Sequence, residues 1–323
     1  MRFGLAILLF TVAAPFVGAA TISQDFASDP ADDGWRVFGD TSLFQWNGTQ
    51  QNLEVTWDSS KPNSYFHRPL GTVLGKDDDF SFAFDLRLDD IAVGVSSNKT
   101  ATFELAIGLL DFATATGTNF LRGTGINAGT GPRNLIEFAY FPDSGFGATV
   151  SPTMISSNNQ FAVGFNFPLE LTPGDLFHVT MTYAASNQTL ATTMSRNGEV
   201  FGPIQNVKPG AGFTDFRVDA ISINSYSDVG ADGSLLAHGI VDNLSFVGPE
   251  PAVGKLSGSW TDGRWQVVFV GRAGWVYFLE RTQDFQFWIE VPPGIDGLNG
   301  GMTLADTNAP APGTFYRVRA ERP

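Results

Sequence analysis

Six polar and aromatic side chains have the chemistry to hold a sugar. Sugar sites stack a pyranose ring on an exposed aromatic side chain and pair its hydroxyls with acidic, amide or guanidinium groups. Strand parity places three charged candidates on the faces opposite Phe84, Leu105 and Phe138, so we expect Arg87, Glu104 and Glu137 to face outward on a concave sheet. The other three candidates lie in loop or turn surroundings. The candidates are Trp46, Arg87, Glu104, Glu137, Asp143 and Tyr226. The alternative is that the charges only solvate one face while the aromatic rings complete the core.

Acidic residues also suggest two metal sites. The loop from Asp228 to Asp232 offers two carboxylates and flexible carbonyls, which suit calcium, although it lacks the regular ligand spacing of an EF-hand. Asp25 and Asp242 would meet if the first and last strands of the large domain pair, and two like charges would then need protonation or a cation. Structural calcium is therefore the one cofactor that these residues suggest. The alternative for the loop is a solvated turn, because Asp and Gly are ordinary turn residues.

No catalytic residue can be assigned from the sequence. Glycoside hydrolysis ordinarily needs two carboxylates about 5 to 9 Å apart. The nearest stretch is residues 136–141, where Glu137 is followed by Ala139 and Phe141 on the same strand face. The histidines share no metal-like spacing, and no Gly-x-Ser-x-Gly motif accompanies them. These observations favour a binding function over catalysis.

Composition excludes several classes of protein. The chain has 323 residues and no cysteine, which removes disulfide scaffolds, thiolate metal sites and cysteine nucleophiles. Its net charge of -14 would repel a phosphate backbone, so nucleic acid is not an expected partner. Hydrophobic residues make up 43% and phenylalanine alone contributes 29 side chains, enough for a large core.

The elements that must position these residues are strands. Residues 80–88 alternate Phe80, Phe82, Phe84, Leu86 and Leu88 with polar or small residues, as a strand buried on one face does. Similar alternation recurs at residues 103–109, 136–140 and 177–183, and weaker runs lie at 52–57, 189–196 and 220–225. Asn197 and Gly198 predict a type I′ hairpin. Many short strands without crossover helices predict an all-β fold, an antiparallel jelly-roll sandwich or barrel.

Two segments of the chain lie outside its predicted domains. Residues 1–20 have a positive start, an apolar stretch and a small-residue cleavage site, which predicts a secretory signal peptide. No later segment has the apolar length of a membrane span. Residues 248–254 hold two prolines flanked by glycines, which predicts a linker. The predicted domains are residues 21–247 and a smaller β domain, residues 255–323, whose tryptophans Trp265, Trp275 and Trp288 we assign to its core.

The large domain resembles the concanavalin A-like lectin and glucanase superfamily in its laminin-G-like form. The residues that carry this resemblance are the alternation at 80–88, the strand at 176–183 followed by the Asn197-Gly198 hairpin, and the closing stretch 241–246. The resemblance implies two curved antiparallel sheets and a glycan-binding concave face. Residues 277–280, 284–288 and 315–319 are similar to a small C-terminal β module of secreted proteins from verrucomicrobial-type bacteria.

The resemblance also allows a comparison with the catalytic and metal-binding residues of these families. Hydrolases of this fold share a Glu-x-Asp-x-x-Glu strand, and legume-type lectins hold manganese and calcium with a Glu-x-Asp strand. Glu137 matches the first position, whereas Ala139 replaces the aspartate in both patterns. The function expected is a secreted, non-catalytic carbohydrate-binding or adhesion protein whose partner is a polysaccharide or cell-surface glycan. A divergent polysaccharide-degrading enzyme and a structural surface module without a small ligand remain as alternatives.

Overall fold

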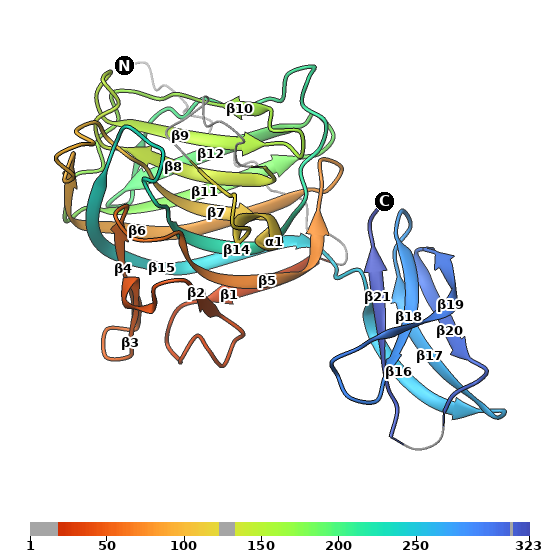
Figure 1. The fold of residues 1–323 in the computed structure, drawn as a ribbon. Helices are drawn as coiled ribbons and strands as arrows, with labels where there is room; N and C mark the ends of the chain where they lie inside the picture. The colour runs from red at the N-terminus through yellow and green to blue at the C-terminus, as the bar shows by residue number, and fades with distance from the viewer. Residues whose placement is uncertain (1–18, 123–132, 311–312) are drawn as a thin grey trace, which may run out of the picture.

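Alternating apolar residues build two antiparallel sheets that pack face to face (Figure 1). The computed structural model describes residues 19–122, 133–310 and 313–323. The expected signal peptide lies almost wholly outside these residues. Sheet A runs in the order β13 (Glu199–Phe201), β12 (Thr189–Arg196), β11 (Leu176–Ala184), β6 (Phe80–Val93), β15 (Leu235–Pro249), β4 (Asn52–Asp58) and β3 (Phe44–Asn47), with β1 (Ala19–Gln24) also paired to β15. The all-β jelly-roll sandwich predicted from the alternation is confirmed.

Sheet B forms the second layer of the sandwich. Its order is β10 (Phe161–Val163), β9 (Thr149–Ile155), β8 (Leu135–Phe141), β7 (Leu105–Leu110), β14 (Val218–Ser225), β5 (Ser64–Leu74) and β2 (Arg36–Phe38). Two short helices accompany the sheets: η1 (Thr41–Leu43) and α1 (Phe112–Ala115). Among the described residues, no helix has the length and apolar character that crossing a membrane requires.

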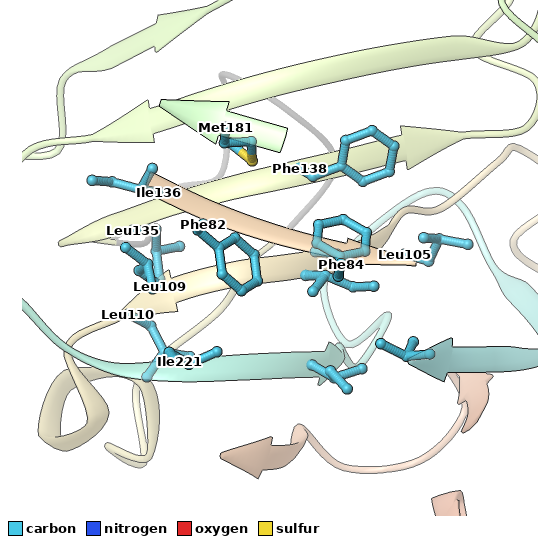
Figure 2. Close-up of a cluster of buried hydrophobic side chains, with 14 of the residues drawn as sticks. Phe82, Phe84, Leu105, Leu109, Leu110, Leu135, Ile136, Phe138, Met181 and Ile221 are labelled. Atoms are coloured by element: carbon cyan, nitrogen blue, oxygen red, sulfur yellow. The ribbon is translucent and has the colours of Figure 1, made fainter. Parts of the chain in front are cut away.

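The main core lies between the two sheets (Figure 2). The alternating residues of β6 all point into it: Phe80, Phe82, Phe84, Leu86 and Leu88 are at most 1% exposed. Phe84 of sheet A meets Phe138 of sheet B edge to face, with ring centroids 5.6 Å apart. Burial of these large side chains is the main force that holds the sheets together.

Sheet B is covered on its second face as well. Every residue of β7, β8 and β9 is buried, so these strands do not have the solvated face that alternation predicts. Residues 111–122, which include α1, cover part of this second face: Phe112 stacks on His67 of β5 with ring centroids 3.9 Å apart, and the Tyr65 hydroxyl donates to the carbonyl oxygen of Ala115 at 2.9 Å. Where this segment lies, the outward face of sheet B is a second interior.

A smaller pair of sheets follows the sandwich. Sheet C runs in the order β16 (Gly254–Thr261), β17 (Arg264–Gly271) and β20 (Gly300–Asp306), and sheet D in the order β19 (Ile289–Asp296), β18 (Val276–Thr282) and β21 (Phe315–Glu321). We call these strands the C-terminal module. Its core holds Trp275 as predicted, and Trp265 is partly buried against it. The assignment of Trp288 to the core was wrong, because this half-buried side chain is not among the residues that pack there. β15 continues to Pro249 and β16 begins at Gly254, so only residues 250–253 of the expected linker lie outside strands.

Candidate ligand-binding site

An open cavity of about 520 Å³ lies where four loops meet at one end of the sandwich. The loops join β6 to β7, β8 to β9, β10 to β11, and β14 to β15. The lining residues are Val93, Thr100, Ala101, Thr102, Phe141, Asp143, Ser144, Gly145, Thr149, Phe165, Asp232 and Gly233. Two residues singled out from the sequence, Asp143 as a sugar ligand and Asp232 as a metal ligand, thus line the same cavity.

Close backbone packing fixes one wall of the cavity. Ala101 and Gly233 form a parallel bridge, and a Cβ atom at Gly233 would lie 1.8 Å from the carbonyl oxygen of Thr102. Only glycine fits at that approach. Next to it, the Ser234 hydroxyl donates to the carbonyl oxygen of Lys99 at 2.7 Å and accepts from the backbone N–H of Ser96 at 2.9 Å. The loop that carries Asp232 is therefore held against the loop that follows β6.

A tight turn positions Asp143 on the other wall. The Ser144 hydroxyl donates to the carbonyl oxygen of Gly147 at 2.9 Å, and Gly145 and Gly147 have φ values of 82° and 97°, which favour glycine. Asp143 Oδ1 accepts from the backbone N–H of Gly145 at 3.2 Å. The other carboxylate oxygen accepts no hydrogen bond from the described residues. The turn leaves half of this carboxylate free for a ligand.

Exposed phenylalanines surround the same end of the sandwich. Phe165 lines the cavity and is nearly half exposed. Phe146, which follows the Asp143 turn, is 74% exposed and stacks on Phe167 with ring centroids 5.3 Å apart. Large aromatic rings left in solvent side by side are uncommon unless they contact a partner. Here they accompany two carboxylates.

The charge of the cavity selects its ligand. Asp143 and Asp232 are acidic, and no lysine, arginine or histidine is among the lining residues that the structure describes. An anionic ligand would meet uncompensated negative charge, whereas hydroxyl groups can donate to these carboxylates. The arrangement therefore suits a neutral polyol with an apolar face.

Asp228 has a partner that differs from the metal expected from the sequence. Lys99 Nζ lies 2.7 Å from Asp228 Oδ1, and the Ser59 hydroxyl donates to Oδ2 at 3.2 Å. The ammonium group supplies the positive charge that a calcium ion would bring. Asp228 therefore holds the loop through an ion pair, and it does not line the cavity with Asp232.

The second expected metal pair is brought together where β1 ends. β1 (Ala19–Gln24) pairs with β15, the last strand of the sandwich, and Asp25 directly follows β1, near enough to Asp242 on β15 for their charges to interact. Burial raises the pKa of Asp242, and the charges of Asp85 and Asp25 add to the increase. His178 and Asn243 both hydrogen bond to Asp85. Within residues 19–122, 133–310 and 313–323 no three His, Asp or Glu side chains are grouped to hold a metal ion.

Glu104, Glu137 and Tyr226 are buried, which corrects the expectation that they face a ligand. Each is at most 2% exposed, because residues 111–122 cover this face of sheet B. Phe120 packs on the Tyr226 ring with centroids 6.1 Å apart. Strand parity placed the two glutamates on the face opposite the main core correctly, but it could not reveal the chain that covers that face.

Arg122 lies between the two glutamates. Its Nε is 3.0 Å from Glu137 Oε2 and 3.2 Å from Glu104 Oε1. Asn224 Nδ2 donates to Glu137 Oε1 at 3.0 Å, and the Tyr226 hydroxyl donates to the same oxygen. The Glu104 carboxyl has no hydrogen-bond partner among the described residues. Glu137 is thus the carboxylate that the surrounding groups stabilise.

Burial shifts the titration of this cluster. It raises the pKa of Glu104; Arg122 opposes the increase and Glu137 adds to it. Burial likewise raises the pKa of Tyr226 well above its usual range. Glu104 therefore keeps its proton near neutral pH, and the cluster is an arginine paired with one carboxylate. It is closed to a sugar chain in the described structure, unlike the open acid pair of a glycosidase.

Trp46 and Arg87 do not line the cavity. Trp46 lies on β3, partly exposed as expected, and its indole N–H donates to the carbonyl oxygen of Phe26 at 3.0 Å. Arg87 lies on the outer face of β6 and forms an exposed ion pair with Asp89 at 3.1 Å. An exposed pair of this kind contributes little stability. Of the predicted site residues, Asp143 and Asp232 are the two that line the cavity.

Sequence reasoning missed two residues that matter. Phe165 gives no periodic signal, since it lies between Gly164 and Asn166 in an irregular stretch. Arg122 lies outside any predicted strand. The one property that sets it apart in the sequence is its positive charge in a chain with 33 acidic residues. Both are placed by tertiary contacts between segments far apart in sequence.

Comparisons with known proteins give similarity in fold only. No family model and no curated protein matches the chain. Similar solved structures include peanut lectin in complex with a peptide, at 15% identity and a TM-score of 0.46, covering 72% of this chain and 98% of that chain. Lectin I from Ulex europaeus, at 10% identity and a TM-score of 0.45, covers 72% and 99%. The endo-1,3-beta-glucanase from Streptomyces sioyaensis, at 11% identity and a TM-score of 0.38, covers 75% and 100%. Each has a concanavalin A-like jelly-roll fold.

Proposed function

We propose that this protein is a secreted, non-catalytic carbohydrate-binding protein that holds a neutral glycan in the cavity between Asp143 and Asp232. The observation that carries the proposal is the presence of two carboxylates and a half-exposed phenylalanine in one open cavity of about 520 Å³, whose described lining holds no basic side chain. A cavity of this size suits a small ligand, for which about 300–1,000 Å³ is usual. A cell-surface glycan or a polysaccharide end is the partner that this chemistry fits.

Each side chain has a defined part in the proposed complex. The free oxygen of Asp143 and the carboxylate of Asp232 accept hydrogen bonds from sugar hydroxyls. Phe165 packs on the C–H face of a pyranose ring. The hydroxyls of Thr100 and Ser144 lie on the rim of the same cavity and can pair with further hydroxyls.

A glycan array of neutral and acidic oligosaccharides tests the proposal. The full chain is expected to bind neutral glycans, and Asp143→Ala and Asp232→Ala each to weaken that binding roughly tenfold or more, since a hydrogen bond to a charged group contributes about 1.5–3 kcal/mol. Asp89→Ala is the matched control, because Asp89 is an exposed carboxylate on sheet A outside the cavity. Preference for acidic glycans, or equal binding by all four proteins, would refute the proposal.

The enzyme alternative has a separate test. Glu104 and Glu137, the two described glutamates that approach Arg122, are buried and closed to a sugar chain. We therefore expect no release of reducing ends from plant or marine polysaccharides. Release that disappears in Glu137→Gln would restore the alternative of a divergent hydrolase.

Secretion is tested at the N-terminus. Expression of the full chain and sequencing of the exported product are expected to give a start at Thr21, or one residue earlier if cleavage follows Ala19. In the structure Ala19 and Ala20 pair with Pro249 and Gly248 as the start of β1. A product that stays in the cell with residues 1–20 attached would contradict secretion.

A further inference from the structure

We propose a second sugar site on the C-terminal module, in an aromatic groove formed by Trp260, Trp265 and Tyr316. The groove has a volume of about 410 Å³ and is separate from the cavity in the sandwich. Its remaining described lining residues are Ala309, Pro310, Gly313 and Thr314. The ligand assigned to it is a neutral oligosaccharide.

The groove is held in shape by the strands around it. Trp260 of β16 pairs with Trp265 of β17, and Trp265 stacks on Tyr316 of β21 with ring centroids 5.2 Å apart and an interplanar angle of 19°. A Cβ atom at Gly258 would lie 2.4 Å from the Trp265 ring, so the absence of a side chain at Gly258 lets the ring lie against β16. The aromatic surface thus joins sheet C to sheet D.

A buried carboxylate fixes the third ring. The Tyr316 hydroxyl donates to Asp306 Oδ2 at 3.1 Å, and Arg281 Nη1 lies 2.7 Å from the same oxygen. Asp306 is only 2% exposed. Tyr316 is therefore held in one orientation before a ligand binds. Binding then costs less conformational entropy, because this side chain does not have to become ordered.

Two features distinguish this groove from ordinary core packing. Trp260 is 58% exposed, although it is the largest type of apolar side chain and a β strand holds it at the surface. Trp265 Nε1 and Thr314 Oγ1 are shielded from solvent and have no hydrogen-bond partner within the described residues. The exposed Trp260 ring offers an apolar face to a ligand as it stands, whereas the two shielded atoms gain a partner only when the chain around them opens.

The chemistry of the groove favours a sugar over a peptide. No described lining residue is charged, so it selects neutral ligands. Proline-rich peptides also bind aromatic grooves, where a proline enters between rings. Trp265 and Tyr316 are stacked on each other, so no slot is open between these two rings. The C–H face of a pyranose ring packs on an exposed indole such as that of Trp260.

A second site would change how the protein binds a polymer. One chain would contact a polysaccharide at the sandwich cavity and at the groove, and the second contact would benefit from a high effective concentration. The groove does not depend on the sandwich cavity, because the two share no residue.

Fluorine NMR of the full chain labelled with 5-fluorotryptophan tests the groove directly. The chain has seven tryptophans, so Trp260 and Trp265 can be assigned by single Trp→Phe variants. The probes are cellohexaose, laminarihexaose, xylohexaose and chitohexaose. At least one is expected to shift the Trp260 and Trp265 signals saturably and to leave the signal of buried Trp275 in place.

Variants separate this site from the one in the sandwich. Trp260→Ala is expected to weaken the effect on Trp265 roughly tenfold, and Trp260→Phe to restore most of it, because a ring face remains. Leu298→Ala, at a 67% exposed residue of the same module outside the groove, should change nothing. The Asp143→Ala and Asp232→Ala double variant should keep the shifts even if the sandwich binds no sugar. Loss of the shifts in that double variant, silence with all four sugars, or a response to a proline decamer alone would overturn the proposal.

Discussion

Arg122 donates its Nε hydrogen to Glu137 Oε2 at 3.0 Å inside the layer between sheet B and the chain that covers it. Both side chains are at most 2% exposed, and Glu104 lies on the other side of the same Nε. A buried charge is tolerated only when it is paired, because its transfer from water is costly. This ion pair therefore ties the end of residues 111–122 to sheet B, in addition to the contacts of Phe112 and Phe120.

Loss of the guanidinium is expected to destabilise the sandwich strongly. Arg122→Met keeps most of the side-chain volume but leaves Glu137 buried without its cation, which costs about 3–5 kcal/mol when one partner of a buried pair is removed. Urea unfolding at neutral pH measures the change. Arg87→Met is the control, since its pair with Asp89 is exposed and contributes at most about 1 kcal/mol. Equal midpoints for the two variants would show that the buried pair is not structural.

Glu104 is expected to make the protein less stable as the pH rises. Burial raises the pKa of Glu104 from 4.5 to about 8, so between these values the folded state holds a proton that the unfolded state has released. The free energy of unfolding therefore falls with increasing pH through this interval and levels off above the folded pKa.

Glu104→Gln should remove that slope, because an amide keeps the shape of the protonated acid and does not titrate. Unfolding in urea from pH 6.5 to 9 measures the effect, in a range above the ordinary pKa of the histidines. Glu54→Gln is the matched control at an exposed site on β4. If the wild type and Glu104→Gln lose stability in parallel, Glu104 is ionised in the folded protein.

Gly233 is expected to be essential to the cavity. In Gly233→Ala the new methyl group would lie 1.8 Å from the carbonyl oxygen of Thr102, so the loop that carries Asp232 must move. We expect the free energy of unfolding to fall by at least about 1 kcal/mol. We also expect the folded protein to bind the glycan much more weakly, because Asp232 is displaced from the cavity. Gly210→Ala is the control, since nothing lies within 4 Å of a Cβ atom there. Unchanged glycan affinity in a folded Gly233→Ala protein would show that the loop that carries Asp232 does not contribute to glycan binding.

Local sequence patterns predicted the part of the fold that local chemistry determines. The alternation at 80–88 gives β6, and Asn197 and Gly198 have the positive φ values, 51° and 87°, that a type I′ turn between β12 and β13 requires. β9 could not be recognised, because Pro152 and hydroxyl residues interrupt its apolar pattern although every residue in it is buried. Burial on both faces of a strand leaves no alternation for a period of two to detect.

The candidate site was predictable residue by residue but not as a whole. Asp143 and Asp232 each lie in a loop with turn residues. From the sequence we assigned Asp143 to a sugar site and Asp232 to a metal site. Their common cavity arises because antiparallel strands bring the loops after β8 and after β14 to the same end of the sandwich. Glu104 and Glu137 show the opposite case: their strand face was predicted correctly, whereas the ion pair with Arg122 depends on a long-range contact.

The most direct test of the proposed function is a crystal structure of the full chain with the neutral oligosaccharide that binds most tightly on the array. We predict a sugar ring in the sandwich cavity with hydroxyls within hydrogen-bond distance of Asp143 and Asp232 and its C–H face on Phe165. A sugar bound on the outer face of sheet A, beside Arg87 or Trp46, with the cavity filled by water, would contradict the account.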